Sequence, residues 1–139
     1  MGRILGIDFG SKRVGLALSD VGRIIAFPYK TLHYRSSSDL FERLVSLIEQ
    51  LEVGKIVVGL PLGMKGQRTA QTIKVEKFIS VLEKSLSVPV DLIDERLTST
   101  EAIRSLQRQG YKPSRDKGLI DETAATIFLQ AYLDSFSSS

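Results

Sequence analysis

The chain has 139 residues, of which 42% are hydrophobic and 25% are charged, and it contains no cysteine. This length suits one domain, expected over residues 1–135, that buries roughly two-thirds of its unfolded-chain surface, and the lack of cysteine excludes disulfides and thiol chemistry. A net charge of +3 is compatible with a polyanionic partner but does not require one. No apolar run reaches the roughly 18 residues of a membrane span, and no signal peptide is recognisable, so we expect a cytoplasmic protein without a membrane partner.

Three short strands are expected first, over residues 3–8, 14–19 and 25–29. They are joined by the turn-like segments 10–13 and 20–23, whose lengths suit hairpins. These strands should therefore form an antiparallel meander.

Helix and strand patterns alternate after the meander. Helices are predicted over 40–51 and 75–86, and strands over 55–59 and 90–94. The Thr-x-x-Glu spacing of residues 98–101 is typical of a capping box and predicts a third helix through Gln109. A last helix is expected over 121–135, and residues 136–139 read as a disordered tail. This order predicts an α/β fold with a mixed five-stranded sheet, three antiparallel strands followed by parallel ones, and helices on both faces.

Three acids lie at positions where functional sites form in a sheet of this kind. Asp8 closes the first strand, Glu95 follows the last strand, and Asp121 opens the final helix. The carboxyl ends of parallel strands meet at one edge, so Asp8 and Glu95 should converge there. Asp121 shares a helix face with an apolar stripe, and this stripe suits packing against the sheet. The residues of the stripe are Ala124, Ala125, Phe128 and Tyr132. The structural alternative for Asp121 is a simple N-cap.

Carboxylates gathered in this way call for a counter-charge. Two of them about 4 Å apart repel by roughly 4 kcal/mol at an effective dielectric constant near 20. A donor set without histidine or cysteine selects hard cations, Mg²⁺ or Mn²⁺, and a pair of such ions supports in-line hydrolysis of a phosphodiester. We therefore expect Asp8, Glu95 and Asp121 to be both metal ligands and catalytic residues of a phosphodiesterase that acts on nucleic acid.

Basic residues occupy the probable loops near these acids. The candidates for contacts with a nucleic-acid backbone are Lys12, Arg13, Lys65, Arg68, Arg96, Thr98, Arg115 and Lys117. Ordinary solvated charge is the alternative for each cluster, and a structural salt bridge is an equal alternative for Arg96. Phe9, Tyr34 and Tyr111 could stack on bases, although single aromatic residues more often pack locally.

Four segments, taken together, resemble the YqgF (RuvX) family of the ribonuclease H-like superfamily. They are Gly6–Gly15, Gly59–Leu62, Asp94–Ser99 and Asp121–Ala125, in the family's order and across nearly the whole chain. The resemblance implies a ribonuclease H-like fold, in agreement with the strand order, and implies that Asp8, Glu95 and Asp121 bind the metals, with Asp8 touching both ions. One departure from the family pattern is Gly63, where many relatives are expected to have asparagine. This difference affects the expected loop shape and substrate binding.

The resemblance also implies a role in maturation of the 5′ end of precursor 16S rRNA, with structured RNA or a pre-ribosomal particle as the partner. An older proposal for the family, based on likeness to RuvC, is Holliday junction resolution on branched DNA. The sequence leaves open the choice between RNA and DNA, between endo- and exonucleolytic cleavage, and between a monomer and a weak homodimer.

Two other classes of function compete with a nuclease. The Asp-x-Gly-Ser segment from Asp8 also resembles the first phosphate loop of actin-like ATPases and sugar kinases, but those proteins bind nucleotide between two such domains and this chain carries the motif once. A non-catalytic nucleic-acid-binding module is the second alternative. It predicts that alanine at Glu95 leaves every activity unchanged.

Overall fold

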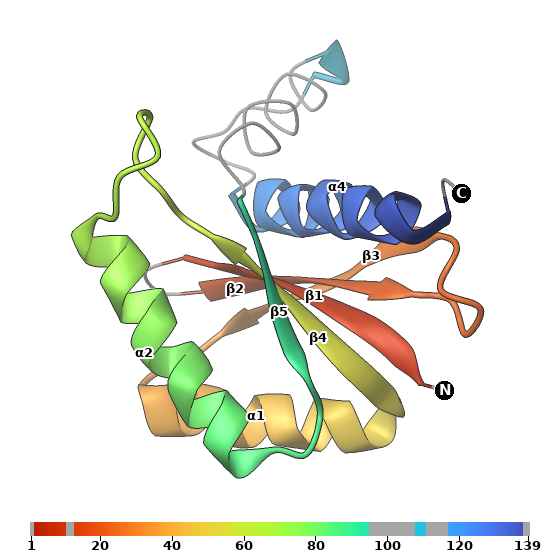
Figure 1. The fold of residues 1–139 in the computed structure, drawn as a ribbon, viewed down its shortest axis with the longest axis horizontal. Coiled ribbons are helices and arrows are strands. Elements are labelled where there is room, and N and C mark those ends of the chain that lie inside the picture. Colours follow the sequence, from red (N-terminus) through yellow and green to blue (C-terminus); the bar gives the residue numbers. More distant parts are fainter. Residues whose placement is uncertain (1, 11–12, 95–107, 111–116, 138–139) are drawn as a thin grey trace.

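A computed structural model of the chain describes residues 2–10, 13–94, 108–110 and 117–137. Within these residues five strands form one sheet in the order β3-β2-β1-β4-β5 (Figure 1). The strands are β1 (Arg3–Phe9), β2 (Arg13–Ser19), β3 (Ala26–His33), β4 (Val53–Leu60) and β5 (Val90–Asp94). β2 pairs antiparallel with both β1 and β3, whereas β4 pairs parallel with β1 and β5. The mixed sheet expected from the sequence is therefore confirmed.

The third strand is longer than expected. It begins one residue later than predicted and continues four residues past Tyr29 to His33. Pro28 interrupts the apolar pattern but is tolerated because β3 lies at the edge of the sheet, and the β2–β3 register shifts at the neighbouring pair. The added segment buries Leu32 in the core.

Helices cover both faces of the sheet. α1 (Ser37–Gln50) and α2 (Ala70–Ser85) lie on one face, and α4 (Lys117–Ser137) lies on the other (Figure 1). N-cap side chains stabilise the starts of α1 and α2. The Ser36 hydroxyl accepts a hydrogen bond from the Asp39 N–H, and Thr69 forms a capping box with Thr72. The core is thus split into two layers by the sheet.

The last helix differs from its prediction at both ends. It begins at Lys117, so Asp121 lies inside the helix and the N-cap interpretation of Asp121 is wrong. It ends at Ser137 rather than Ser135, and Phe136 packs its ring 5.0 Å from that of Tyr132, so residues 136 and 137 are helical rather than a tail. The helix predicted through Gln109 falls mostly outside the described residues. No helix in the described part of the chain is long and apolar enough to cross a membrane.

The predicted apolar stripe of α4 does pack against the sheet. Ala124, Ala125 and Phe128 are at most 1% exposed. The sheet meets them with small residues, since a β-carbon on Gly6 would lie 3.2 Å from the Leu129 side chain. The helix therefore runs close over β1 and β2, which carry the first predicted acid.

Candidate active site

Asp8 lies on the central strand β1, between two glycines of the neighbouring strands. It pairs with Gly15 on β2 and with Gly59 on β4, and paired residues of neighbouring strands point to the same face of a sheet. The two glycines leave both flanks of Asp8 without side chains. Asp8 is only 8% exposed, and it shares its face of β1 with Gly6, which packs against α4. It is a buried acid near the carboxyl ends of β1 and β4, where the sequence placed it.

Asp121 is brought to the same place by close contact between α4 and β2. A β-carbon built on Gly15 would lie 2.3 Å from the carbonyl carbon of Asp121 and 2.6 Å from its Cβ. No other residue type fits between these two backbones. At the next residue of the helix, the Glu122 carboxylate accepts a hydrogen bond of 2.7 Å from Thr31, the residue of β3 that pairs with Gly15, and this bond holds the same part of the helix on the sheet. The register of α4 on the sheet therefore fixes where Asp121 lies.

Arg13 supplies a positive charge to this acid. Its Nε donates to Oδ2 of Asp121 at 2.6 Å, and the two side chains are only 27% and 17% exposed. Arg13 stands two residues before Gly15 on β2 and so shares its face of the sheet. The sequence suggested a phosphate contact for Arg13, whereas in the structure its guanidinium binds a carboxylate.

The pKa of Asp121 reports the balance of these effects. Burial raises the pKa above its ordinary value of 3.8, the nearby charge of Asp8 raises it further, and the bond from Arg13 only partly opposes this rise. The surroundings of Asp121 therefore favour the gain of positive charge, as a proton or as a bound cation. Both facing groups are carboxylates, the donors that Mg²⁺ and Mn²⁺ prefer, so these residues fit a hard divalent ion.

The third predicted ligand cannot be placed beside this pair. Glu95 lies outside the described residues, and among the residues that are described no group of three or more histidine, cysteine or acidic side chains surrounds a possible metal position. Four candidate phosphate contacts also lie outside them, namely Lys12, Arg96, Thr98 and Arg115. Lys117 belongs to the first turn of α4, but its side chain is not described.

The remaining two candidates lie in the loop between β4 and α2. Lys65 and Arg68 are both exposed, and Arg68 forms an ion pair of 2.5 Å with Glu76 on α2. The loop is closed by a 2.8 Å bond from the Gly63 N–H to the Gln67 carbonyl. A β-carbon at Gly63 would meet the Gln67 side chain at 2.3 Å, so the departure from the family pattern lets Gln67 fold back over the loop.

Sequence reasoning missed Gly15 as a determinant of the site. Glycine is unfavourable inside a strand, and its presence there often marks close approach of another backbone. That signal was available in Arg13–Ser19, although it could not reveal that the approaching backbone is Asp121, 106 residues later.

Comparison with known proteins places these features in a family. Residues 2–135 match the family described as "RuvX: Holliday junction resolvase". A relative from Maridesulfovibrio salexigens is 42% identical over 94% of this chain and 97% of its own, and one from Chloroflexus aurantiacus is 41% identical over 98% and 89%. Both carry the name "putative pre-16S rRNA nuclease".

Solved structures give the fold. RuvC of T. thermophilus in complex with a Holliday junction substrate superposes with a TM-score of 0.63 over 100% of this chain and 98% of its own, at 14% identity. The Fowlpox virus resolvase with junction DNA gives 0.56 over 96% and 98%, at 16% identity. The predicted ribonuclease H-like fold is confirmed by these neighbours.

Proposed function

The chain belongs to the RuvX family, and from this premise we propose that it is a divalent-metal-dependent nuclease that processes the 5′ end of precursor 16S rRNA. The observation that carries the proposal is that Asp121 packs on Gly15, the sheet neighbour of Asp8, so that the two acids lie close enough for the charge of Asp8 to raise the pKa of Asp121, near the carboxyl ends of the parallel strands. The name shared by relatives about 40% identical to this chain supports a ribosomal RNA precursor as the substrate.

Asp8 and Asp121 would hold Mg²⁺ or Mn²⁺, and Glu95 is proposed as the third ligand. A divalent ion bound there would help to activate a water and to stabilise the leaving oxygen of the phosphodiester. Asp8 contributes a rigid ligand, because it lies on a strand that is hydrogen-bonded on both sides. Asp121 contributes a ligand whose position is set by helix packing on Gly15.

Arg13 acts on Asp121 and orients its carboxylate. Its Nε occupies one oxygen, Oδ2, which leaves Oδ1 as the atom that can face Asp8. The same positive charge favours the ionised form of Asp121 and partly opposes the effects of burial and of Asp8, which raise its pKa. The candidate phosphate contacts expected from the sequence are proposed to position the phosphate backbone, namely Lys12, Lys65, Arg68, Arg96, Thr98, Arg115 and Lys117.

A second candidate function is Holliday junction resolution. It is favoured by the description of the matching family and by the full-length superposition on RuvC bound to a junction. Symmetric cutting of two strands normally requires two copies of the site, so this function predicts a dimer on the DNA.

The test compares three substrates: a labelled precursor 16S 5′-leader RNA, the corresponding pre-ribosomal particle and a four-way DNA junction. Each is incubated with Mg²⁺, Mn²⁺ or EDTA and with the parent protein, Asp8→Asn or Asp134→Asn. Asp134 is an exposed acid on α4 and serves as the control. We expect metal-dependent cleavage of the RNA or the particle that Asp8→Asn abolishes and Asp134→Asn retains.

Selective cutting of the junction would instead establish the resolvase. Binding without cleavage of any substrate would contradict the nuclease and favour the non-catalytic module.

A further inference from the structure

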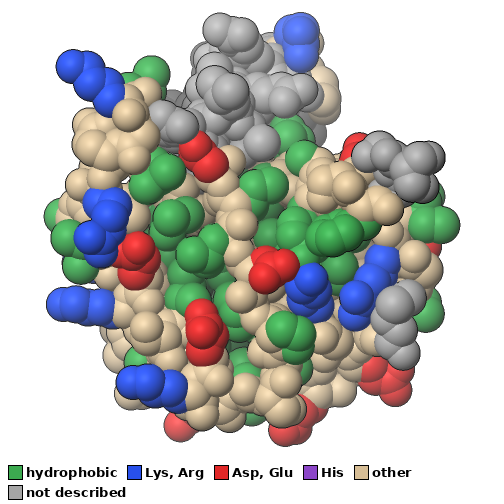
Figure 2. Space-filling view, in the orientation of Figure 1, with side chains coloured by type: hydrophobic (Ala, Val, Ile, Leu, Met, Phe, Trp, Pro, Cys, Tyr) green, Lys and Arg blue, Asp and Glu red, His purple; other side chains and the backbone are tan. Residues whose placement is uncertain are grey.

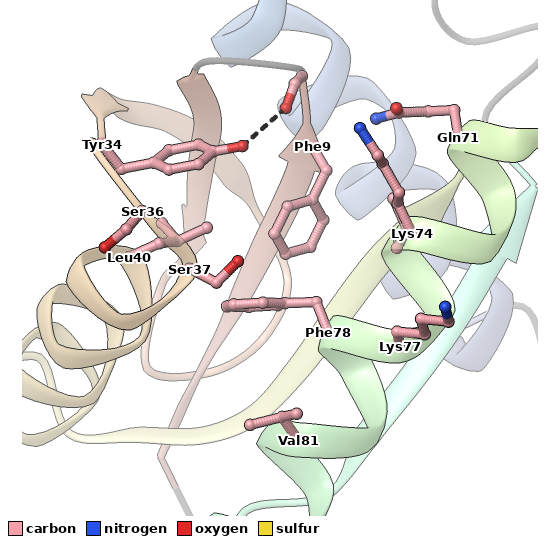
Figure 3. Close-up of a pocket in the computed structure, with 12 residues that line it drawn as sticks. Phe9, Tyr34, Ser36, Ser37, Leu40, Gln71, Lys74, Lys77, Phe78 and Val81 are labelled. Atoms are coloured by element: carbon pink, nitrogen blue, oxygen red, sulfur yellow. Dashed lines mark hydrogen bonds between the residues drawn. The ribbon is translucent and has the colours of Figure 1, made fainter.

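Asp8 and Asp121 form an acid pair on the α4 face of the sheet, and a pocket of about 480 Å³ opens on the opposite face, where Phe9 at the end of β1 lines it. It lies between the start of α1, the end of β1 and the first three turns of α2 (Figure 3). Phe9, which lines it, directly follows Asp8 and therefore points to the other face of β1. The volume is within the usual range of small-ligand sites. The acid pair and this pocket thus share one edge of the sheet.

The interior of the pocket is aromatic and aliphatic. The rings of Phe9 and Phe78 meet edge to face with centroids 5.1 Å apart, and both project into the space between α1 and α2 (Figure 3). Leu40 and Val75 continue this apolar surface, and Val81 leaves 49% of its area exposed. Such a surface offers a ring face to a flat apolar group.

The mouth of the pocket is polar and positively charged. The Lys74 amine and the Gln71 amide lie together at the end nearest Phe9, and Tyr34 donates a 3.1 Å hydrogen bond to the Gly10 carbonyl across from them (Figure 3). In the described part of the chain neither Lys74 nor Lys77 forms an ion pair. The two lysines are one turn apart on α2 and both line the pocket, so both can contact the same bound strand.

Positive charge also extends beyond the mouth. Figure 2 shows Lys and Arg side chains spaced along the left margin of the molecule, where α2 and the loop before it lie in Figure 1. The basic residues of these two segments are Lys65, Arg68, Lys74, Lys77 and Lys84, against the two acids Glu76 and Glu83. This margin is complementary to a polyanion that passes the pocket.

We propose that the pocket binds one unpaired nucleotide of the nucleic-acid strand that lies at the acid pair, with the base against Phe78 and the phosphate near Lys74 and Lys77. A ring face beside cations is the chemistry by which proteins hold single strands, and it is sequence-tolerant because every base has a flat face. The proposal rests on the proposed function in one respect, namely that the strand held here is the one that the acid pair cleaves. With this pocket, the protein binds single-stranded nucleic acid next to its site of cleavage.

The test measures binding of a fluorescent 12-nucleotide oligouridylate by anisotropy in EDTA, where cleavage cannot occur. Lys74→Glu and Phe78→Leu are each expected to weaken binding about tenfold, since stacking and a phosphate contact are each of that order. Lys84→Glu is the matched control, because it changes the same charge on the same helix outside the pocket. We expect it to weaken binding no more than threefold.

Photocross-linking with 5-iodouridine in the same oligonucleotide locates the base. We expect the cross-linked tryptic peptides to be 78–84 and 4–12, which contain Phe78 and Phe9. This readout uses the parent protein and does not depend on whether Phe78→Leu folds. Cross-links confined to other peptides would overturn the proposal, as would equal binding by Lys74→Glu and Lys84→Glu.

These outcomes separate the pocket from the nuclease. If the parent cleaves RNA but the pocket variants bind the oligonucleotide as the parent does, the pocket proposal fails and the nuclease stands. If the parent cleaves nothing but Lys74→Glu and Phe78→Leu lose binding, the nuclease fails and the nucleotide pocket stands. No saturable binding of the oligonucleotide at all would contradict the pocket proposal and point to an occupant of another class.

Discussion

Gly15 and Asp121 are in direct backbone contact, since a β-carbon on Gly15 would lie 2.4 Å from the Asp121 carbonyl oxygen and 2.6 Å from its Cβ. The strand residue next to Gly15 in the sheet is Asp8. The space left by one missing side chain therefore sets the distance between the two acids.

Gly15→Ala should displace α4 from the sheet. The added methyl group meets backbone rather than a flexible side chain, so we expect a loss of about 2–3 kcal/mol in the free energy of unfolding, together with the loss of most cleavage activity. Gly22→Ala is the control, because its nearest neighbour, an Asp20 carboxylate oxygen, would be 3.4 Å away. Urea denaturation and a cleavage assay measure both effects. An alanine variant with parental stability and activity would show that the contact is unimportant.

Arg13→Gln should destabilise the protein most at high pH. Arg13 lowers the pKa of Asp121, so its contribution exists where Asp121 is ionised and is lost as the pH falls through the folded-state pKa. We expect a loss of about 1–2 kcal/mol at pH 8, because the pair is partly buried, and a much smaller loss at pH 4. Chemical denaturation at the two pH values measures the difference. A loss that is independent of pH would argue against the ion pair.

Asp121→Asn should stabilise the metal-free protein at neutral pH. The folded-state pKa of Asp121 is raised, first by burial and then by Asp8, so the ionised form costs stability above that pKa. We expect the variant to exceed the parent by about 1 kcal/mol at pH 7.5 in EDTA, with the gain shrinking as the pH falls towards 4. Thermal unfolding in EDTA measures the gain. Millimolar Mg²⁺ should reduce it, because only the parent binds the ion well.

Tyr132→Phe should lower the free energy of unfolding by loosening the C-terminal half of α4, without changing the candidate active site. The Tyr132 hydroxyl donates to Asp91, which also pairs with Lys55 at 3.1 Å, and these two bonds lower the pKa of Asp91. Because Asp91 is about half exposed, we expect a loss of only about 0.5–1 kcal/mol at pH 7, fading as the pH falls through the lowered pKa. Cleavage activity per folded molecule should be unchanged, and a large loss of activity would contradict this separation.

Much of the fold was predictable because its signals are local. The apolar patterns located the five strands, and the helical spacing located α1 and α2, although α2 begins at Ala70, five residues before its predicted start. The stripe from Ala124 to Tyr132 identified the sheet-facing side of α4. The start of α4 was wrong for a physical reason. Gly118 disfavours a helix and Asp121 resembles a cap, so the sequence signal moves the boundary to Asp121, whereas the helix begins one turn earlier.

The site was predictable only in part. The positions of Asp8 and Asp121 follow from strand ends and helix faces, and the structure brings them together. The partner of Arg13 does not follow, because Arg13 and Asp121 are 108 residues apart and meet only through the register of α4 on β2. The metal-binding role of the two acids and of Glu95 stays a prediction.

The most direct test of the account is a calorimetric titration with Mn²⁺. We predict that the parent binds the ion with an affinity that falls at least tenfold in Asp8→Asn and in Asp121→Asn, while Asp134→Asn, an exposed acid on the same helix as Asp121, binds like the parent. Equal affinity in all four proteins would contradict the assignment of the acid pair as the metal site.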